Sequence, residues 1–184
     1  MAERLKPTEV FDVDSIRYSN IDIQSKYEDG IENGGKWLMF IDKSKLDEVW
    51  ANCCQIYDEE KLIGVSHLKC STNFKNPRTN SHQSGAIRFY CGPASEEKKI
   101  IEIGRNILKF IPYHCITGYM IYKSNEQTKK GTRKTGQKIN HLYKLQVPKR
   151  EKRLSSEEVN KLMGNFSELK TCNISIKNDS SQAK

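Results

Sequence analysis

Apolar and polar positions alternate in short blocks along the middle of the chain. After the Asn33-Gly34-Gly35 turn, residues 36–41 form a run dominated by bulky apolar side chains, which predicts a buried strand. A helix begun by Ser44 is predicted next, because apolar residues then recur at helical spacing. Its apolar face consists of Leu46, Val49, Trp50 and Cys53. We expect Trp37 and Trp50 to lie in the core, since each belongs to one of these apolar sets.

Further blocks of the same kind follow. Strands are predicted over residues 62–68, 86–91, 115–122 and 142–147. A second helix is predicted between Ser95, which would cap it, and Pro112, which would end it. Its apolar stripe consists of Ile100, Ile103, Ile107, Leu108 and Ile111. This order of elements predicts an α+β domain, with sequential strands side by side and the helices grouped on one face of the sheet.

The ends of the chain carry weaker patterns. Residues 1–32 form a polar N-terminal arm, predicted to be partly ordered as an edge strand or a wrapping segment. The domain itself is assigned to residues 33–147. A basic linker and an amphipathic helix, which begins with a capping box at Ser155, follow over residues 148–170. Residues 171–184 are predicted to be disordered.

Positive charge is concentrated near the end of the domain. Residues 123–153 hold eleven Lys and Arg side chains and two Glu, a net +9, whereas the whole chain carries +8. Such a segment indicates an anionic partner, and phosphate polymers are the commonest one. A solvated loop that keeps the protein soluble is the alternative. Residues 149–153 (KREKR) also resemble a nuclear localisation signal, so we expect the protein in the cytoplasm and also in the nucleus.

Cysteine usage and hydropathy bear on compartment and cofactors. The six cysteines include no C-x-x-C pair, so free thiols are expected rather than a zinc site. No apolar run approaches the ~20 residues of a membrane span, and the first residues lack the apolar core of a signal peptide. We therefore expect an intracellular monomer that contacts no membrane and holds no metal or cofactor.

Candidate catalytic groups do not fall into a known motif. Residues 131–138 have the outline of a phosphate loop, but Gln137 stands where such a loop needs lysine. A metal-free phosphodiesterase site would need a general base and a phosphate clamp. The candidates for these roles are His67, His82, Tyr119 and Lys123. Nothing in their spacing requires such a site, so a non-enzymatic function is expected, and an enzyme acting on small nucleotides is an alternative.

Several short segments, taken in their order and spacing, resemble the translation initiation factor 4E superfamily. The similar segments are residues 34–40 (GGKWLMF), 47–50 (DEVW), 101–105 (IEIGR) and 117–119 (TGY). The resemblance covers about residues 29–147. Residues 62–64, 122–128 and 142–143 are more similar to an uncharacterised branch typified by basophilic leukaemia expressed protein. The fold that this implies is a curved antiparallel sheet with helices packed on its convex face.

The resemblance also implies where a ligand would bind. Cap-binding members sandwich methylated guanine between two tryptophans, but here the loop before Gly34 is short and no tryptophan lies upstream of it. Tyr90 corresponds to a third aromatic near the methyl group, and Tyr119 is a second candidate for base stacking. Losing two stacking rings costs several powers of ten in affinity, so tight cap binding is not expected. Translation factors of this fold bind partner peptides on their helical face, which implies a protein partner there.

The predicted function is therefore non-enzymatic binding of RNA or nucleotide phosphates through a basic concave face and loop, with strong salt dependence. The predicted phosphate-binding residues are Lys69, Lys75, Arg78, Lys123, Lys129, Lys130, Arg133 and Lys134. Two alternatives stay open. One is a divergent cap-binding translation initiation factor, and the other is a protein-interaction adaptor that uses the dorsal helices and the helix near residue 155.

Overall fold

The computed structural model describes residues 5–28, 33–75, 83–130 and 141–149. The chain divides into a unit of residues 1–150 and a unit of residues 151–184, and every described residue belongs to the first. The predicted C-terminal helix and tail, and most of the basic linker, therefore lie outside the described residues.

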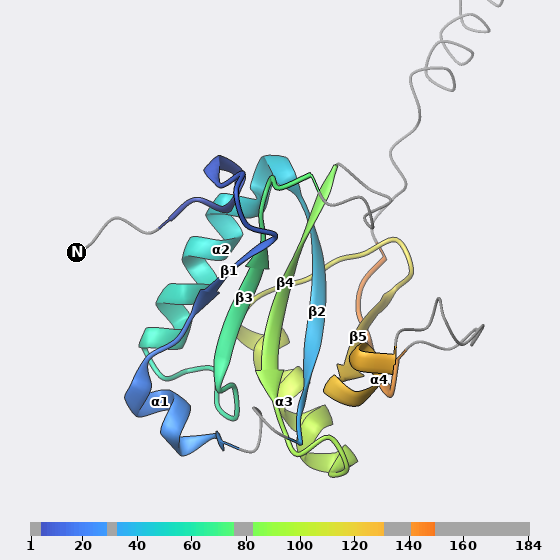
Figure 1. Cartoon of the computed structure of the whole chain (residues 1–184). Coiled ribbons are helices and arrows are strands. Elements are labelled where there is room, and N and C mark those ends of the chain that lie inside the picture. Colours follow the sequence, from blue (N-terminus) through green and yellow to red (C-terminus); the bar gives the residue numbers. More distant parts are fainter. Residues whose placement is uncertain (1–4, 29–32, 76–82, 131–140, 150–184) are drawn as a thin grey trace, which may run out of the picture. The chain divides into compact units, whose positions relative to one another are not determined.

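A single antiparallel sheet forms the centre of this unit, and Figure 1 looks onto one of its faces. The described part of the sheet holds six strands. In spatial order they are β1 (Ser15–Tyr18), β3 (His67–Ser71), β4 (Ser84–Cys91), β2 (Gly35–Asp42), β5 (Tyr119–Ser124) and β6 (Tyr143–Gln146). Each neighbouring pair is antiparallel, which confirms the predicted α+β class. The predicted edge strand in the N-terminal arm is β1.

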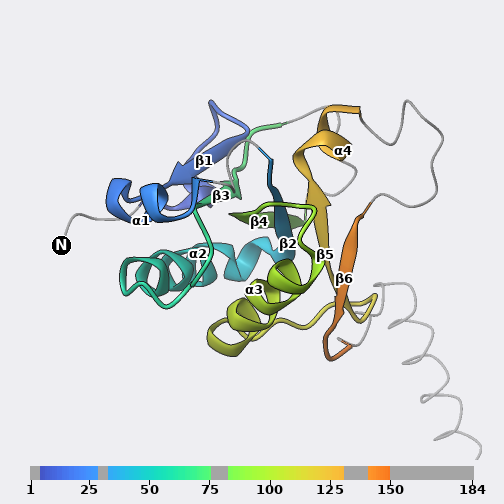
Figure 2. The same cartoon turned by 90° about the horizontal axis from the view of Figure 1, so that it is seen from below.

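The two long helices lie together on one face of the sheet. They are α2 (Lys43–Asp58) and α3 (Glu97–Phe110), whereas the short helix α4 (Asn125–Lys130) lies on the opposite face (Figure 2). The N-terminal segment adds a 3-10 turn, η1 (Pro7–Glu9), and the helix α1 (Ile21–Lys26). The prediction that the long helices group on one face is confirmed.

Both tryptophans lie in the core between this face and the helices, as predicted. Trp37 on β2 is fully buried, and its indole Nε1 donates a hydrogen bond to the carbonyl oxygen of Ile100 at 3.1 Å. Helix α3 packs closely on the indole ring because Gly104 has no side chain. A Cβ atom at Gly104 would lie only 2.7 Å from the ring of Trp37. Trp50 on α2 packs edge-on against Tyr18 of β1.

Two predicted caps are wrong in detail. The side chain of Asp42 caps α2 by accepting a hydrogen bond from the backbone N–H of Ser44 at 3.1 Å, so Ser44 is inside the helix and does not cap it. At α3 the cap position is Glu96, with no side-chain hydrogen bond, so Ser95 does not cap this helix. In both cases the helix boundary differs from the predicted one by a residue or two.

Two predicted strands begin later than expected because a glycine in a left-handed conformation precedes each. Gly64 has a φ of 85° and belongs to a turn in which the Val65 N–H donates to the Leu62 carbonyl, so β3 begins only at His67. Gly118 has a φ of 73° and closes a similar turn before β5. Alternation of apolar residues does not distinguish a strand from an apolar turn of this kind.

The Gly, Thr, Asn and Lys content of residues 123–138 predicts a loop, but Asn125–Lys130 within this segment form the helix α4. A capping box starts this helix: the backbone N–H of Gln127 donates to the hydroxyl of Ser124 at 3.0 Å, and the Ser124 N–H donates to the side-chain oxygen of Gln127 at 3.1 Å. This reciprocal pair satisfies two backbone donors, so the segment begins a helix although most of its residues are polar.

Candidate functional site

The sheet face opposite α2 and α3, called the open face here, receives every second side chain of each strand. Pairing between strands sets these side chains in rows across the sheet. One row consists of His67, Tyr90, Lys36 and Lys123. The next row consists of Arg17, Lys69, Arg88, Leu38, Ile121 and Lys144. The residues between them in sequence, such as Trp37 and Phe89, are buried against the helices.

These rows gather cations without gathering carboxylates. We call the five cations on the first five strands the basic cluster, and they are Arg17, Lys36, Lys69, Arg88 and Lys123. Among the described strand residues that alternate onto the open face, the only carboxylate is Asp42. Asp42 stands at the far end of β2 and accepts hydrogen bonds from the N–H and the hydroxyl of Ser44. The positive charge on this face is therefore not balanced from within the sheet.

The lack of a balancing negative charge is clearest at Lys36. Its side chain is only 6% exposed, and its ammonium donates to Asn125 Oδ1 at 3.2 Å and to Thr128 Oγ1 at 2.6 Å, both on α4. Burial and, to a smaller extent, the positive charges of Arg88, Lys123 and Lys69 together lower the pKa of Lys36 to about 8. Both hydrogen-bond acceptors are neutral, and within the described part of the chain no carboxylate is paired with this ammonium.

Tyr90 stands at the centre of the basic cluster. One face of its ring stacks on the imidazole of His67, with ring centroids 4.2 Å apart and an interplanar angle of 14°. The ammonium groups of Lys36 and Lys69 each lie 5.5 Å from the ring centroid of Tyr90, within the range of cation–π attraction. Cation–π attraction to the Tyr90 ring therefore stabilises the ammonium groups of Lys36 and Lys69.

His67 is neutral at ordinary pH. Burial and, to a smaller extent, the positive charges of Arg17 and Lys69 together lower its pKa to about 3. Its Nδ1 lies 3.0 Å from the hydroxyl of Ser66. A histidine with so low a pKa does not hold the proton that a general acid must donate at neutral pH.

The predicted site residues are partly brought together. Lys69, Lys123 and Tyr90 lie on the open face, and Tyr119 lies on the same face at the other end of β5, with the Lys144 ammonium 4.8 Å from its ring centroid. Lys75 is exposed after β3. The others that are described lie on α4, where Lys129 is exposed and Lys130 is paired with Glu126 at 2.6 Å. Arg78, His82, Arg133 and Lys134 lie outside the described residues.

Sequence reasoning missed three members of the basic cluster: Arg17, Lys36 and Arg88. The alternation of the predicted strands contained the signal for two of them. Arg88 stands between Ile87 and Phe89, and Lys36 precedes Trp37, so each must point away from the apolar side of its strand. Which cations then become neighbours depends on the register between strands, and no local pattern reveals that.

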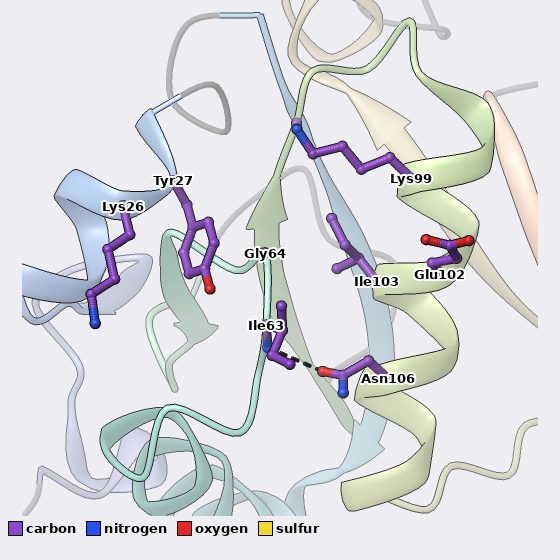
Figure 3. Close-up of a pocket in the computed structure, with 9 residues that line it drawn as sticks. Lys26, Tyr27, Ile63, Gly64, Lys99, Glu102, Ile103 and Asn106 are labelled. Atoms are coloured by element: carbon purple, nitrogen blue, oxygen red, sulfur yellow. Dashed lines mark hydrogen bonds between the residues drawn. The ribbon is translucent and has the colours of Figure 1, made fainter.

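A cavity of about 410 Å³ lies on another part of the unit, between α1, the turn before β3 and helix α3 (Figure 3). Tyr27, Ile63 and Ile103 form much of its lining, and Lys26 and Lys99 stand at its edges. Lys26 is paired with Glu60 at 2.6 Å and Lys99 with Glu96 at 3.7 Å. Because its cations are paired with carboxylates, this cavity is a weaker candidate for an anion than the open face.

Other chemistries find little support among the described residues. The five described cysteines are free and buried. Burial raises the pKa of Cys53, of Cys70 to about 12, and of Cys91, so those three thiols are not activated nucleophiles. No three His, Cys, Asp or Glu side chains gather into a metal-binding group within the described ranges. None of the helices in the described part is long and apolar enough to cross a membrane.

Comparison with known proteins identifies the architecture. No family model and no curated protein sequence matches the chain. Among solved structures, the Schistosome initiation factor 4E, complexed with m7GpppG and 4E-BP, matches with a TM-score of 0.54 and 18% identity, over 77% of this chain and 75% of that one. The chain has an initiation-factor-4E-like fold. The predicted fold class is thereby confirmed. The branch within the superfamily stays a prediction.

Two further structures match less closely. Initiation factor 4E-3 of C. elegans, in complex with the 4E-binding protein Mextli, has a TM-score of 0.47 and 12% identity and covers 64% of this chain and 61% of that one. Initiation factor 4E-3 of Ascaris suum, in complex with an m2,2,7G cap, has a TM-score of 0.47 and 14% identity, covering 64% and 60%. At these identities the likeness concerns the fold alone.

Proposed function

We propose that this chain binds the phosphate groups of RNA or of nucleotides on the open face, without chemical turnover. The observation that carries the proposal is the basic cluster, which sets five cations on neighbouring strands of a face left open by the two long helices. Contacts of Lys and Arg with phosphate supply affinity and orientation but little sequence preference. The salt dependence of binding should therefore be steep.

Lys36 supports the same function. A buried ammonium that none of the described carboxylates pairs with costs folding free energy, and its pKa of about 8 reflects that cost. A phosphate on the open face would bring the missing negative charge close to Lys36, Lys69 and Arg88. A bound ligand that neutralises the charge of Lys36 would explain why a destabilising lysine stands at this position, because functional sites commonly reduce the stability of a fold.

A binding titration with matched charge variants tests the proposal. The variant Lys69→Gln with Arg88→Gln removes two cations of the basic cluster, and Lys98→Gln with Lys109→Gln removes two exposed cations from α3. With a short single-stranded RNA, we expect the first variant to bind more weakly and its salt slope to fall by about 0.7 for each phosphate contact removed. The second variant should bind as the wild type does. Equal RNA affinity of the first variant and the wild type would contradict the proposal.

A second candidate function is binding of the methylated mRNA cap, as in a divergent initiation factor. It is favoured by the matching Schistosome factor, which is complexed with m7GpppG. Calorimetry with 7-methyl-GTP and GTP at two salt concentrations separates the two functions. Calorimetry is the better readout because both tryptophans are buried on the helix side, away from the open face. A methyl preference that survives salt would favour cap binding, whereas equal, salt-sensitive affinities would favour general phosphate binding.

A protein partner on the helical face is a further candidate, because the same Schistosome structure contains 4E-BP. A partner held by apolar contacts with α2 and α3 should co-purify with the chain at high salt. An RNA held by the basic cluster should be released under the same conditions.

A further inference from the structure

Two large aromatic side chains on strands of the sheet are exposed. Phe40 on β2 is 47% exposed and Tyr119 on β5 is 41% exposed, and both alternate onto the open face. The other large hydrophobic side chains that are as exposed lie outside the strands, in turns, in α1 or in the N-terminal segment. We call Phe40 and Tyr119 the aromatic patch. Leu38 and Ile121, which pair with each other, lie between it and the row of Lys36 and Lys123.

The aromatic patch lies next to the basic cluster. Arg88 pairs with Leu38, and Phe40 is two residues further along β2. With strands about 4.8 Å apart and a rise of about 3.4 Å per residue, the Cα atoms of Arg88 and Phe40 are roughly 8 Å apart. A nucleotide whose phosphate contacts Arg88 can therefore place its base on Phe40.

Tyr90, the other aromatic ring of the open face, is already covered. His67 stacks on one side of it, and the ammonium groups of Lys36 and Lys69 lie 5.5 Å from its centroid. A base arriving at Tyr90 would have to displace one of these neighbours. By contrast, the ring of Phe40 is half exposed.

We infer that the open face binds single-stranded nucleic acid, with phosphates on the basic cluster and a base stacked on the aromatic patch. This inference rests on the proposed function and adds the position and kind of base contact. Charge complementarity selects the occupant: the cations adjoin the patch, and Asp42, the only carboxylate on this face among the described strand residues, is held by Ser44. Leu38 and Ile121 present no groups that read base edges, and stacking accepts every base, so binding should not depend on sequence.

The test compares two probes of equal charge: a five-nucleotide single-stranded RNA and an abasic strand with the same number of phosphates. Stacking contributes roughly 5- to 150-fold in affinity per base, so we expect wild-type protein to bind the RNA more tightly by at least the lower figure. The variants Phe40→Ala and Tyr119→Ala should lose most of this preference and keep their affinity for the abasic strand. Ile63→Ala, at an exposed apolar residue in the turn before β3, is the matched control and should behave as the wild type.

The outcomes separate the inference from the function on which it rests. If wild-type protein binds neither strand, the proposed function fails. If it binds both strands equally, phosphate binding stands and the base contact is refuted. If Phe40→Ala and Tyr119→Ala both keep the full preference for RNA, a base contact exists but the aromatic patch does not make it, which overturns the inference. The wild-type comparison tests the base contact even if a variant fails to fold, and each of the two variants tests the aromatic patch independently of the other.

Discussion

Replacing Lys36 by methionine should make the protein more stable at neutral pH while weakening its binding of anions. In the folded state the pKa of Lys36 falls from 10.5 to about 8. Each unit of this shift corresponds to about 1.4 kcal/mol, so keeping the ammonium charged in the fold costs about 3 kcal/mol. Methionine has a similar length, carries no charge and fits irregular apolar surroundings. The substitution therefore removes the cost without leaving a large cavity.

The gain is offset in part. Lys36 loses its hydrogen bonds to Asn125 and Thr128, each of which contributes about 1 kcal/mol. The net stabilisation at pH 7 is then about 1 kcal/mol, which raises the melting temperature by a few degrees for a chain of this size. Most substitutions of a buried, hydrogen-bonded side chain destabilise, so even a small gain is diagnostic.

The pH dependence gives a sharper measurement than the gain itself. Between pH 8 and 10.5 the unfolded chain holds a proton on Lys36 that the folded chain has released, so wild-type stability rises with pH in this window. Lys36→Met lacks this rise. The unfolding free energy of the variant minus that of the wild type should therefore fall by about 2 kcal/mol from pH 7 to pH 9.5, so the variant changes from about 1 kcal/mol more stable to about 1 kcal/mol less stable. Contributions from all other titrating groups cancel in this difference.

Urea denaturation of both proteins at the two pH values provides the measurement. Lys109→Met, at an exposed lysine of α3, is the control and should show no pH-dependent difference. If Lys36→Met is less stable at pH 7 by an amount that does not change with pH, then Lys36 is not an uncompensated buried charge. That result would remove the electrostatic support for the proposed function.

Three further expectations follow from the same structure. Tripolyphosphate affinity should fall roughly tenfold from pH 7 to pH 9 as Lys36 loses its proton, and calorimetry should find this dependence absent in Lys36→Met. The unfolded chain takes up a proton at His67 near pH 6.5, whereas the folded chain does so only near pH 3, so acidification from pH 7 to pH 5 destabilises the wild type. His67→Gln should reduce this loss of stability by about 2 kcal/mol, as measured by urea denaturation. Gly104→Ala should destabilise the protein by about 1–3 kcal/mol in thermal unfolding, despite the better helix propensity of alanine, because the new Cβ meets the ring of Trp37. The control Arg105→Ala, on the exposed side of α3, should change the unfolding free energy by no more than about 0.5 kcal/mol.

The strands and long helices were predictable because each carries its own periodicity. Residues 36–41 and the stripe of Leu46, Val49, Trp50 and Cys53 indicate β2 and α2 without reference to the rest of the chain. Helix α4 was missed although its signal was local. Ser124 and Gln127 have the spacing of a capping box, but the six-residue helix is too short to show a periodic apolar stripe.

The candidate site was harder to predict because it depends on pairing between distant segments. Lys69, Arg88 and Leu38 become neighbours only in one register of β3, β4 and β2. A shift of one residue would point Arg88 into the core. Burial then sets the properties of the site: Lys36 reads in the sequence as an ordinary strand-end lysine, and only the neighbours that the fold supplies lower its pKa.

Charge summed along the chain and charge gathered on a face are different quantities, and the open face shows why. The residues outside 123–153 are nearly neutral in sum, yet four of the five cations of the basic cluster come from among them. Strand alternation separates the two signs. The described acidic residues of this part lie on helices, in turns or bends and at a strand end, whereas the described open-face positions of β1, β3 and β4 hold cations and no carboxylate. Lys123 belongs to both sets, because it starts the basic segment and pairs with Lys36. We therefore expect an anion to bind where the fold gathers the basic cluster, whatever the net charge of the sequence segments that supply its members.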